Sequence, residues 1–207
     1  MFERYFKGDQ YGLARINEFI RLIDKWNKKI NLVSYKNTEE LKTKHILDSL
    51  TLLDIFSLEK GQVIIDLGTG CGFPGMVLAI ACPENKFLLV ESKKKYYMFL
   101  KKAVQVLNLN NVILYYGRLQ SFPELRQKAD AITTRAVGDI ATITKEAAPF
   151  LKENGMLVFY KGKNVFQELE EHKVCIKEQG FVIKALAKSK VLEKQGMEHF
   201  ILVLEKN

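Results

Sequence analysis

The sequence predicts an α/β fold built on a doubly wound, mainly parallel sheet of seven strands. Two observations lead to this prediction. A glycine-rich turn within residues 63–75 joins an apolar run to a helical pattern, and apolar runs alternate with helical patterns from residue 62 onward. Such alternation is typical of right-handed βαβ crossovers, which give parallel strands covered on both faces. We expect one compact unit, with an N-terminal helical extension over residues 1–60 and a ligand-binding domain over residues 61–207.

Two helices are predicted in the extension. Residues 10–32 place apolar side chains at helical spacing and basic side chains among the polar positions. A second helix is expected to begin near Thr38, as its N-cap, and to run to about Phe56. Residues 1–12 carry charges throughout and lack the apolar core of a signal peptide, so we expect a soluble, cytoplasmic protein.

The elements of the sheet domain follow from the alternation of apolar and amphipathic stretches. Strands are predicted at residues 62–66, 86–90, 111–116, 129–134 and 155–160. Helices are predicted between and after them, at residues 74–81, 93–108, 139–151 and 164–179. The last two apolar runs, at residues 181–186 and 199–205, have no helical pattern between them. They therefore predict an antiparallel hairpin that closes the sheet.

The glycine-rich turn predicts a site for a small molecule. Glycine has no Cβ, so its backbone turns sharply and approaches a ligand closely. Residues 70–75 match G-x-G-x-x-G, which alone is weak evidence for a dinucleotide. Asp66, at the end of the preceding strand, argues against NAD because a carboxylate there would repel a pyrophosphate and suits an ammonium group. Pro74 fits the first turn of the following helix.

Glu91 adds a second acidic residue at the end of the next apolar run. A carboxylate in that place accepts hydrogen bonds from ribose hydroxyls. A ligand that combines a ribose with a cationic amino acid fits both acidic residues, so we interpret it as S-adenosylmethionine rather than NAD. In a doubly wound sheet, the loops after Asp66, Glu91, Tyr116 and Thr134 are expected to converge on this site.

The charge balance favours a polyanionic partner. The chain carries a net charge of +8, and neutralising phosphates releases counterions. Lysines cluster at residues 25–29 and 93–95, although either cluster alone is also compatible with ordinary solvated surface. The 3 cysteines lack C-x-x-C spacing, so we expect no metal site. The longest apolar stretch, at residues 76–82, is too short to span a bilayer, so no membrane partner is expected.

The loop after the fourth predicted strand indicates which acceptor a methyl donor would serve. Methylation of pyrimidine carbon 5 requires a nucleophilic cysteine, and methylation of exocyclic amines commonly uses Asn-Pro-Pro-aromatic. Residues 133–137 contain neither. Guanine N7 has a free lone pair and needs no nucleophile or base, so the absence modestly favours this acceptor. We accordingly expect no catalytic acid, base or nucleophile.

The chain resembles the ribosomal RNA small-subunit methyltransferase G family, also called glucose-inhibited division protein B. The most specific motifs are the Gly-Phe-Pro-Gly end of the glycine-rich turn and a His-x-x-Asp-Ser-Leu segment. The matching segments are residues 31–34, 45–50, 66–75, 91–92 with 94–95, 134–136 and 160–162. The resemblance implies the Rossmann-like fold of class I S-adenosylmethionine-dependent methyltransferases and methyl transfer to N7 of a guanosine in 16S ribosomal RNA. It implies the small ribosomal subunit as partner, and we expect a monomer.

The resemblance also implies cofactor contacts, and together with the turn and Glu91 it gives the following candidate site: Gly68, Thr69, Gly70, Phe73, Glu91, Leu119, Gln120 and Arg135. Gln120 departs from the glutamate expected there, but its amide carbonyl can still accept from the adenine amino group. Residues 197–199 replace a more basic stretch, which puts an RNA contact at this segment in doubt.

Several of these residues have a second interpretation. His45 and Asp48 share one helical face. They either dock the N-terminal helices onto the sheet as a structural pair, or they meet each other or the ligand pocket. Phe73 either stacks on the cofactor or packs beneath the turn. Arg135 binds the cofactor carboxylate, an RNA phosphate or only a neighbouring acid. Cys71 is expected to be a small filler. Two other functions remain open: a basic RNA-binding protein with a vestigial cofactor loop, and a small-molecule methyltransferase.

Overall fold

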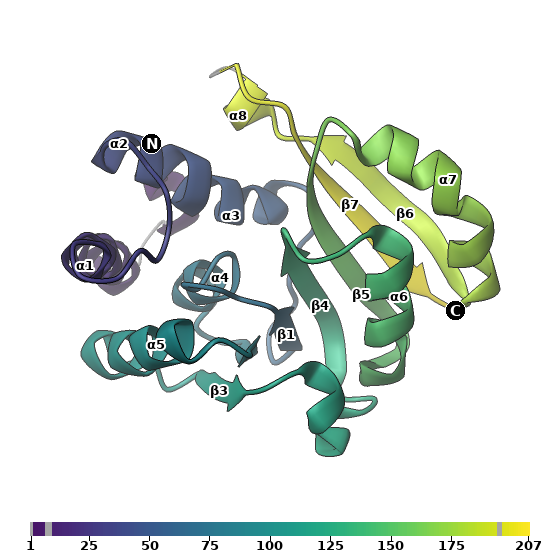
Figure 1. The fold of residues 1–207 in the computed structure, drawn as a ribbon, viewed down its shortest axis with the longest axis horizontal. Helices are drawn as coiled ribbons and strands as arrows, with labels where there is room; N and C mark the ends of the chain where they lie inside the picture. Colours follow the sequence, from purple (N-terminus) through teal and green to yellow (C-terminus); the bar gives the residue numbers. More distant parts are fainter. Residues whose placement is uncertain (1, 7–9, 194–195) are drawn as a thin grey trace.

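A computed structural model describes residues 2–6, 10–193 and 196–207. Within these ranges one sheet is formed by β1 Val63–Leu67, β2 Lys86–Glu91, β3 Val112–Tyr116, β4 Ala129–Arg135, β5 Leu151–Gly162, β6 Phe181–Lys188 and β7 His199–Lys206. The strand order is β3-β2-β1-β4-β5-β7-β6 (Figure 1). Strands β1 to β5 are parallel, whereas β7 runs antiparallel to both β5 and β6. The predicted parallel sheet with an antiparallel closing hairpin is confirmed.

The direction of winding reverses between β1 and β4. The chain moves outward from β1 to β2 and β3, then returns to place β4 on the other side of β1. At such a reversal the loops after neighbouring strands diverge to opposite faces and leave a crevice beyond the carboxyl ends of the strands. The ends of β1 and β4 therefore mark the expected ligand site.

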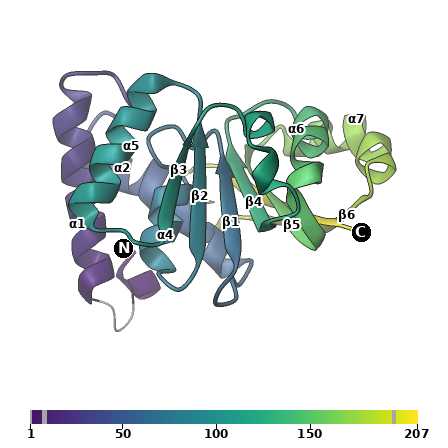
Figure 2. The same ribbon diagram turned by 90° about the horizontal axis from the view of Figure 1, so that it is seen from below.

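Helices cover both faces of the sheet. Their bounds are α1 Gln10–Asn27, α2 Thr38–Leu41, α3 Asp48–Leu50, α4 Gly75–Ala81, α5 Lys94–Leu107, α6 Ile140–Ala147, α7 Val165–Glu178 and α8 Lys190–Glu193. Helices α1 to α5 lie on one side of the sheet, and α6 and α7 lie on the other (Figures 1 and 2).

Each face of the sheet has its own apolar core because successive strand residues point to opposite sides. Ile64 and Phe87 are paired neighbours that belong to the core under α1, α4 and α5. The next pair, Ile65 and Leu88, belongs to the core under α6 and α7. The runs of consecutive apolar residues in β1 and β2 are thus explained by burial on both faces.

The N-terminal helices share the first of these cores. Phe19 of α1 is fully buried, and its ring centre lies 5.9 Å from that of Phe73 and 6.1 Å from that of Phe99. Trp26 makes an edge contact with Phe99 at 5.5 Å. Helix α1 therefore packs directly behind the glycine-rich turn and supports it.

The second predicted helix is not a regular α-helix from 38 to 56. Its N-cap is Asn37, whose side chain accepts from the Glu40 N–H, and not Thr38. After α2 the chain forms a π-helical turn, Lys42–Leu47, in which the Asp48 N–H reaches the Thr43 carbonyl. A 3-10 turn, Thr51–Asp54, follows α3. Periodicity does not reveal the π-helical turn because it adds one residue to an otherwise regular spacing.

Other boundaries differ for identifiable reasons. Helix α1 ends at Asn27 instead of 32 because the Asn27 side-chain oxygen accepts from the N–H groups of Leu32 and Val33. Helix α6 ends at Ala147, ahead of a 3-10 turn that contains Pro149. Pro74 is the N-cap of α4 and lies just before its first turn.

The remaining differences concern the last part of the sheet. Strand β5 begins at Leu151, four residues earlier than expected, and the short helix α8 lies between β6 and β7 where no helix was expected. None of the helices in the described ranges is long and apolar enough to cross a membrane.

Candidate functional site

Two adjoining cavities lie beyond the carboxyl ends of the parallel strands. The larger, which we call the main cavity, measures about 530 Å³ and is lined by the glycine-rich turn, by Glu91 to Lys93 and by Arg135 to Gly138. The smaller, the side cavity, measures about 210 Å³ and is lined by residues 117–120 and the end of β2. Gly68, Ser92 and Val137 line both. The predicted convergence of the loops after β1, β2, β3 and β4 is confirmed.

The glycines of the turn serve two different needs. Gly70 has φ +59°, a conformation that side chains disfavour, and a Cβ on it would meet no described atom within 4 Å. Gly75 instead lies in a crowded place, where a Cβ would come within 2.4 Å of Leu89 and 2.6 Å of the Asp66 carboxylate. Gly70 thus allows the turn beside the main cavity, and Gly75 lets α4 begin close against β1 and β2.

Asp66 holds the turn together from inside. Its carboxylate is fully buried, and its two oxygens accept from the Gly75 N–H at 2.9 Å and the Thr133 hydroxyl at 2.8 Å. Burial raises the pKa of Asp66, and these hydrogen bonds oppose that rise. Asp66 does not line the main cavity. The expectation that it faces an ammonium group of the ligand is therefore wrong, because its carboxylate is fully buried against Gly75 and Thr133 and does not reach the cavity.

Glu91 lies at the end of β2, as predicted, and lines the main cavity. One carboxylate oxygen accepts from the Gly70 N–H at 2.8 Å, and the other accepts from the Lys93 N–H at 2.6 Å. A carboxylate offers about four acceptor positions, so Glu91 can position the turn and still accept from a ligand. Its contact with a ribose stays a prediction.

Phe73 packs beneath the turn and also lines the main cavity. Its buried ring stacks on His45, with centres 5.0 Å apart and planes 22° apart. The guanidinium of Arg135 lies over the same ring at 5.2 Å. The packing interpretation is confirmed for Phe73, while its contact with a cofactor stays a prediction.

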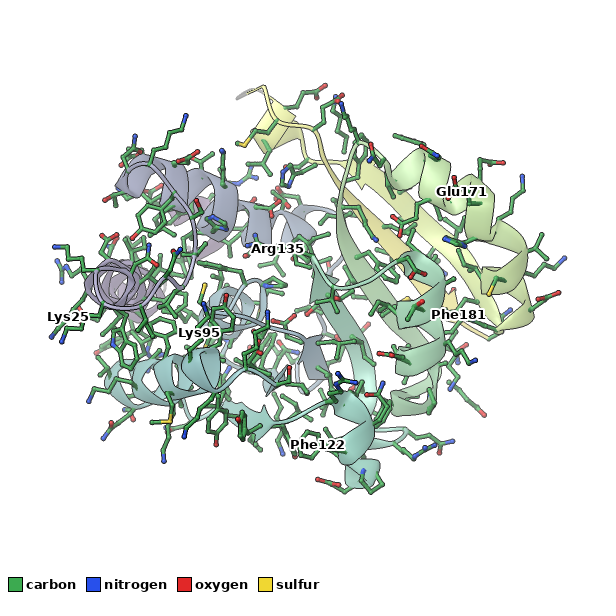
Figure 3. The ribbon with its side chains drawn as sticks, viewed as in Figure 1. Lys25, Lys95, Phe122, Arg135, Glu171 and Phe181 are labelled. Atoms are coloured by element: carbon green, nitrogen blue, oxygen red, sulfur yellow. The ribbon has the colours of Figure 1, made fainter. Side chains whose placement is uncertain are left out.

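Arg135 connects the end of β4 to the N-terminal helices (Figure 3). Its Nη1 donates to Asp48 Oδ2 at 3.0 Å, and its Nη2 donates to His45 Nδ1 at 2.8 Å. The side chain is 17% exposed and lines the main cavity. Of the three partners considered for Arg135, the structure shows the neighbouring acid, Asp48.

The same contact fixes the state of His45. Arginine only donates hydrogen bonds, so Nδ1 is the acceptor and the proton resides on Nε2. Burial and, next, the charge of Arg135 lower the pKa of His45 to about 4. The imidazole is therefore neutral near pH 7.

Leu119 and Gln120 lie apart from the other candidate residues, in the side cavity. They form a 3-10 turn after β3, in which Leu119 is buried and Gln120 is exposed. The structure thus distributes the eight candidate residues along one continuous opening, with Gly68 common to both parts.

A further cavity of about 390 Å³, the Asp48 cavity, adjoins the main cavity on the side of the N-terminal helices. Arg135 and Ala136 line both cavities. The wall of the Asp48 cavity includes His45, Asp48, Tyr160 and His199. The Tyr160 hydroxyl donates to the Ser49 carbonyl at 2.7 Å, which ties this helical segment to β5. His45 and Asp48 thus dock the extension onto the sheet. They line the Asp48 cavity and not the main cavity, so their contact with a ligand stays a prediction.

Sequence reasoning did not identify the contribution of Tyr160 and His199 to this wall. The only signal was the motif at residues 160–162, since His199 belongs to the stretch whose RNA contact was in doubt. Cys71 is buried, and burial raises the pKa of its thiol to about 12. The thiol is therefore protonated at neutral pH, as expected of a filler.

Several relatives of the chain carry the same name. The sequence profile of the family described as rRNA small subunit methyltransferase G matches residues 12–197. A Wolinella succinogenes protein named ribosomal RNA small subunit methyltransferase G is 35% identical over 189 residues, which cover 91% of this chain and 92% of that protein. A Clostridium tetani protein of the same name is 30% identical over 198 residues, covering 93% of this chain and 82% of that protein.

Among solved structures, M. jannaschii TYW2 in complex with AdoMet superimposes with a TM-score of 0.62 at 21% identity, over 87% of this chain and 80% of that one. This likeness shows the fold, that of class I methyltransferases, and agrees with the sheet order and the glycine-rich turn described above. With the family profile matching most of the chain, the protein belongs to the rRNA small subunit methyltransferase G family.

Proposed function

We propose that the protein transfers a methyl group from S-adenosylmethionine to N7 of a guanosine in 16S ribosomal RNA. One observation carries this proposal: in a chain of this family, the main and side cavities form a continuous opening where the winding of the sheet reverses. Ligands of doubly wound folds bind at this place.

The residues present fit the cofactor. Open space beside Gly70 leaves room for a ligand close to the backbone, and Glu91 retains acceptor capacity for ribose hydroxyls. Leu119 and Gln120 would hold the adenine in the side cavity. Gly68 and the side of Arg135 that faces the main cavity would hold the amino-acid end.

S-adenosylmethionine supplies a methyl group that is already activated by the sulfonium, so the protein needs to position the acceptor and exclude water. The side chains around the main cavity agree with this limited task. The Cys71 thiol is protonated, and Arg135 is paired with Asp48. These groups suit an acceptor that carries its own free lone pair, as guanine N7 does.

Two lysine clusters support RNA as the substrate. Lys25, Lys28 and Lys29 lie exposed at the end of α1, and Lys93 to Lys95 lie exposed at the start of α5. None of the six forms an ion pair with any residue that the structure describes.

The second cluster lies beside the main cavity and contacts the segment that follows α1. The Lys95 ammonium donates to the Asn31 carbonyl at 2.7 Å, and Lys93 lines the main cavity. We infer that residues 1–60 form part of an RNA-binding platform beside the domain of residues 61–207. We also infer that a monomer acts in the cytoplasm on the small ribosomal subunit or its RNA.

The test is methyl transfer from tritiated S-adenosylmethionine. The acceptors are small-subunit RNA, small-subunit particles and a metabolite extract. Label in RNA that is cleaved at the labelled site by borohydride and aniline supports guanosine N7. Label confined to metabolites would indicate a small-molecule methyltransferase. RNA binding without label on either RNA or particles would indicate a binding protein with a vestigial cofactor loop.

A further inference from the structure

The Asp48 cavity is separate from the main and side cavities, and the cofactor assigned to those two leaves it without a ligand. Its volume of about 390 Å³ lies within the range of small-molecule pockets, roughly 300–1,000 Å³. It shares Arg135 and Ala136 with the main cavity, so a group bound in it lies next to the place where the methyl donor is expected.

Asp48 is the only acidic side chain among the described residues that line this cavity. Its carboxylate is 1% exposed and is held on both sides, because Oδ2 accepts from Arg135 at 3.0 Å and Oδ1 lies 3.1 Å from His199 Nδ1. About four acceptor positions exist on a carboxylate, and side chains of the described residues occupy two of them. No described residue donates to the remaining positions, and Asp48 lines the cavity.

Guanine presents the matching donors. Its N1–H and N2–H groups lie side by side on the Watson–Crick edge, and two parallel N–H groups suit the two oxygens of a carboxylate. N7 lies on the neighbouring Hoogsteen edge, so its lone pair stays free when N1–H and N2–H of the Watson–Crick edge are bound. Adenine has an acceptor at N1 and would place a lone pair against the carboxylate.

We propose that the Asp48 cavity receives the target guanine and that the Asp48 carboxylate selects it by accepting from N1–H and N2–H. This inference rests on the proposed function and adds the residue that determines base specificity. Arg135 and His199 hold the carboxylate in place, which limits the reorganisation needed when the base enters. Enzymes that act on a base in this way take it out of the stack and read its Watson–Crick edge in a pocket.

The decisive measurement is the guanosine-over-inosine ratio in kcat/KM. Inosine lacks the N2 amino group and retains N1–H, O6 and N7. Small-subunit RNA is ligated to carry guanosine or inosine at the position that the wild-type protein methylates. Removal of a hydrogen bond to a charged group corresponds to about a ten- to hundredfold effect, so wild-type protein should prefer guanosine by about that factor. Asp48→Asn should reduce the preference to about threefold or less.

Matched controls separate recognition from docking. Asp130 lies at the other end of the sheet, and its carboxylate also accepts from two donors, a backbone N–H and a lysine. Asp130→Asn should therefore keep the wild-type preference for guanosine over inosine. Calorimetry should show unchanged S-adenosylmethionine affinity for Asp130→Asn, and for Asp48→Asn it measures separately any effect that passes through Arg135. If Asp48→Asn does not fold, RNA with 1-methylguanosine at the target tests the wild-type protein directly, because it lacks N1–H and should be a poor acceptor.

Two results would overturn the inference. Equal use of guanosine, inosine and 1-methylguanosine by the wild-type protein would show that the edge is not read. A folded Asp48→Asn variant that is slower on both RNAs but keeps the ratio would show that Asp48 only docks the helix. Absence of label from guanosine RNA with wild-type protein would instead contradict the proposed function itself.

Discussion

Substitution of Gly70 by alanine should weaken cofactor binding without disrupting the fold. Gly70 has φ +59° and lines the main cavity, and a Cβ there meets no described atom within 4 Å. An alanine therefore keeps the hydrogen bond to Glu91 and clashes with no atom of the described residues. Its methyl group would take space from the ligand, and overpacking of this kind costs about 1–3 kcal/mol. The dissociation constant for S-adenosylmethionine should rise roughly five- to 150-fold.

Gly61→Ala is the matched control. Gly61 has φ +82°, also has no described atom within 4 Å of a Cβ position, and does not line the main cavity. Both variants should lose about 1–2 kcal/mol of unfolding free energy, since an L side chain disfavours positive φ. Denaturant unfolding measures that loss, and calorimetry measures the affinity. Wild-type affinity in Gly70→Ala would show that the cofactor does not reach the turn. Equal loss of affinity in both variants would attribute it to general destabilisation.

Three further predictions concern charge and hydrogen bonding. The pKa of His45 is lowered from 6.5 to about 4, so the unfolded state binds the proton first and stability falls as pH drops from 6.5 towards 4. Between pH 7.5 and 5.5 the wild-type protein should lose about 1.3 kcal/mol more unfolding free energy than His45→Gln. Glu91→Ala should weaken S-adenosylmethionine binding about ten- to hundredfold in calorimetry, and Glu91→Gln, which keeps one acceptor oxygen, should weaken it less. Changing Lys25, Lys28 and Lys29 to glutamine should make RNA affinity less dependent on salt. The slope of log affinity against log salt concentration should become shallower by roughly 0.7 for each phosphate that the protein no longer neutralises. Cofactor affinity should stay unchanged.

Each of these has a clear contrary outcome. Parallel stability curves for the wild-type protein and His45→Gln would mean that the imidazole is not held neutral by the fold. Unchanged affinity in a folded Glu91→Ala variant would remove Glu91 from the cofactor site. An unchanged salt dependence would assign Lys25, Lys28 and Lys29 to solvated surface, with the RNA path elsewhere.

The features that the sequence revealed are those set by local pattern. The buried runs of β1 and β2 follow from apolar residues that fill two cores, and the position of Glu91 follows from the end of such a run. The use of Asp66 could not be inferred this way. Its partners are an N–H nine residues later and a hydroxyl 67 residues away on another strand, and local pattern predicts neither contact.

The Asp48 cavity could not be predicted from local sequence pattern either. Asp48 meets Arg135 across 87 residues and His199 across 151. Only the folded arrangement of α3, β4 and β7 brings these side chains together. The motif around His45 pointed to the segment but left open whether it docks or binds, because both roles favour the same residue types.

The π-helical turn Lys42–Leu47 makes the direction of Asp48 depend on the number of residues ahead of it. In an α-helix each residue turns the chain by about 100°, so removing one residue from this turn would rotate everything after it by about that angle. Asp48 would then point away from Arg135, even though no residue of the site had been exchanged. In this stretch the number of residues matters as much as their identity: a one-residue deletion would separate Asp48 from Arg135 and His199, whereas many single side-chain changes in it would not.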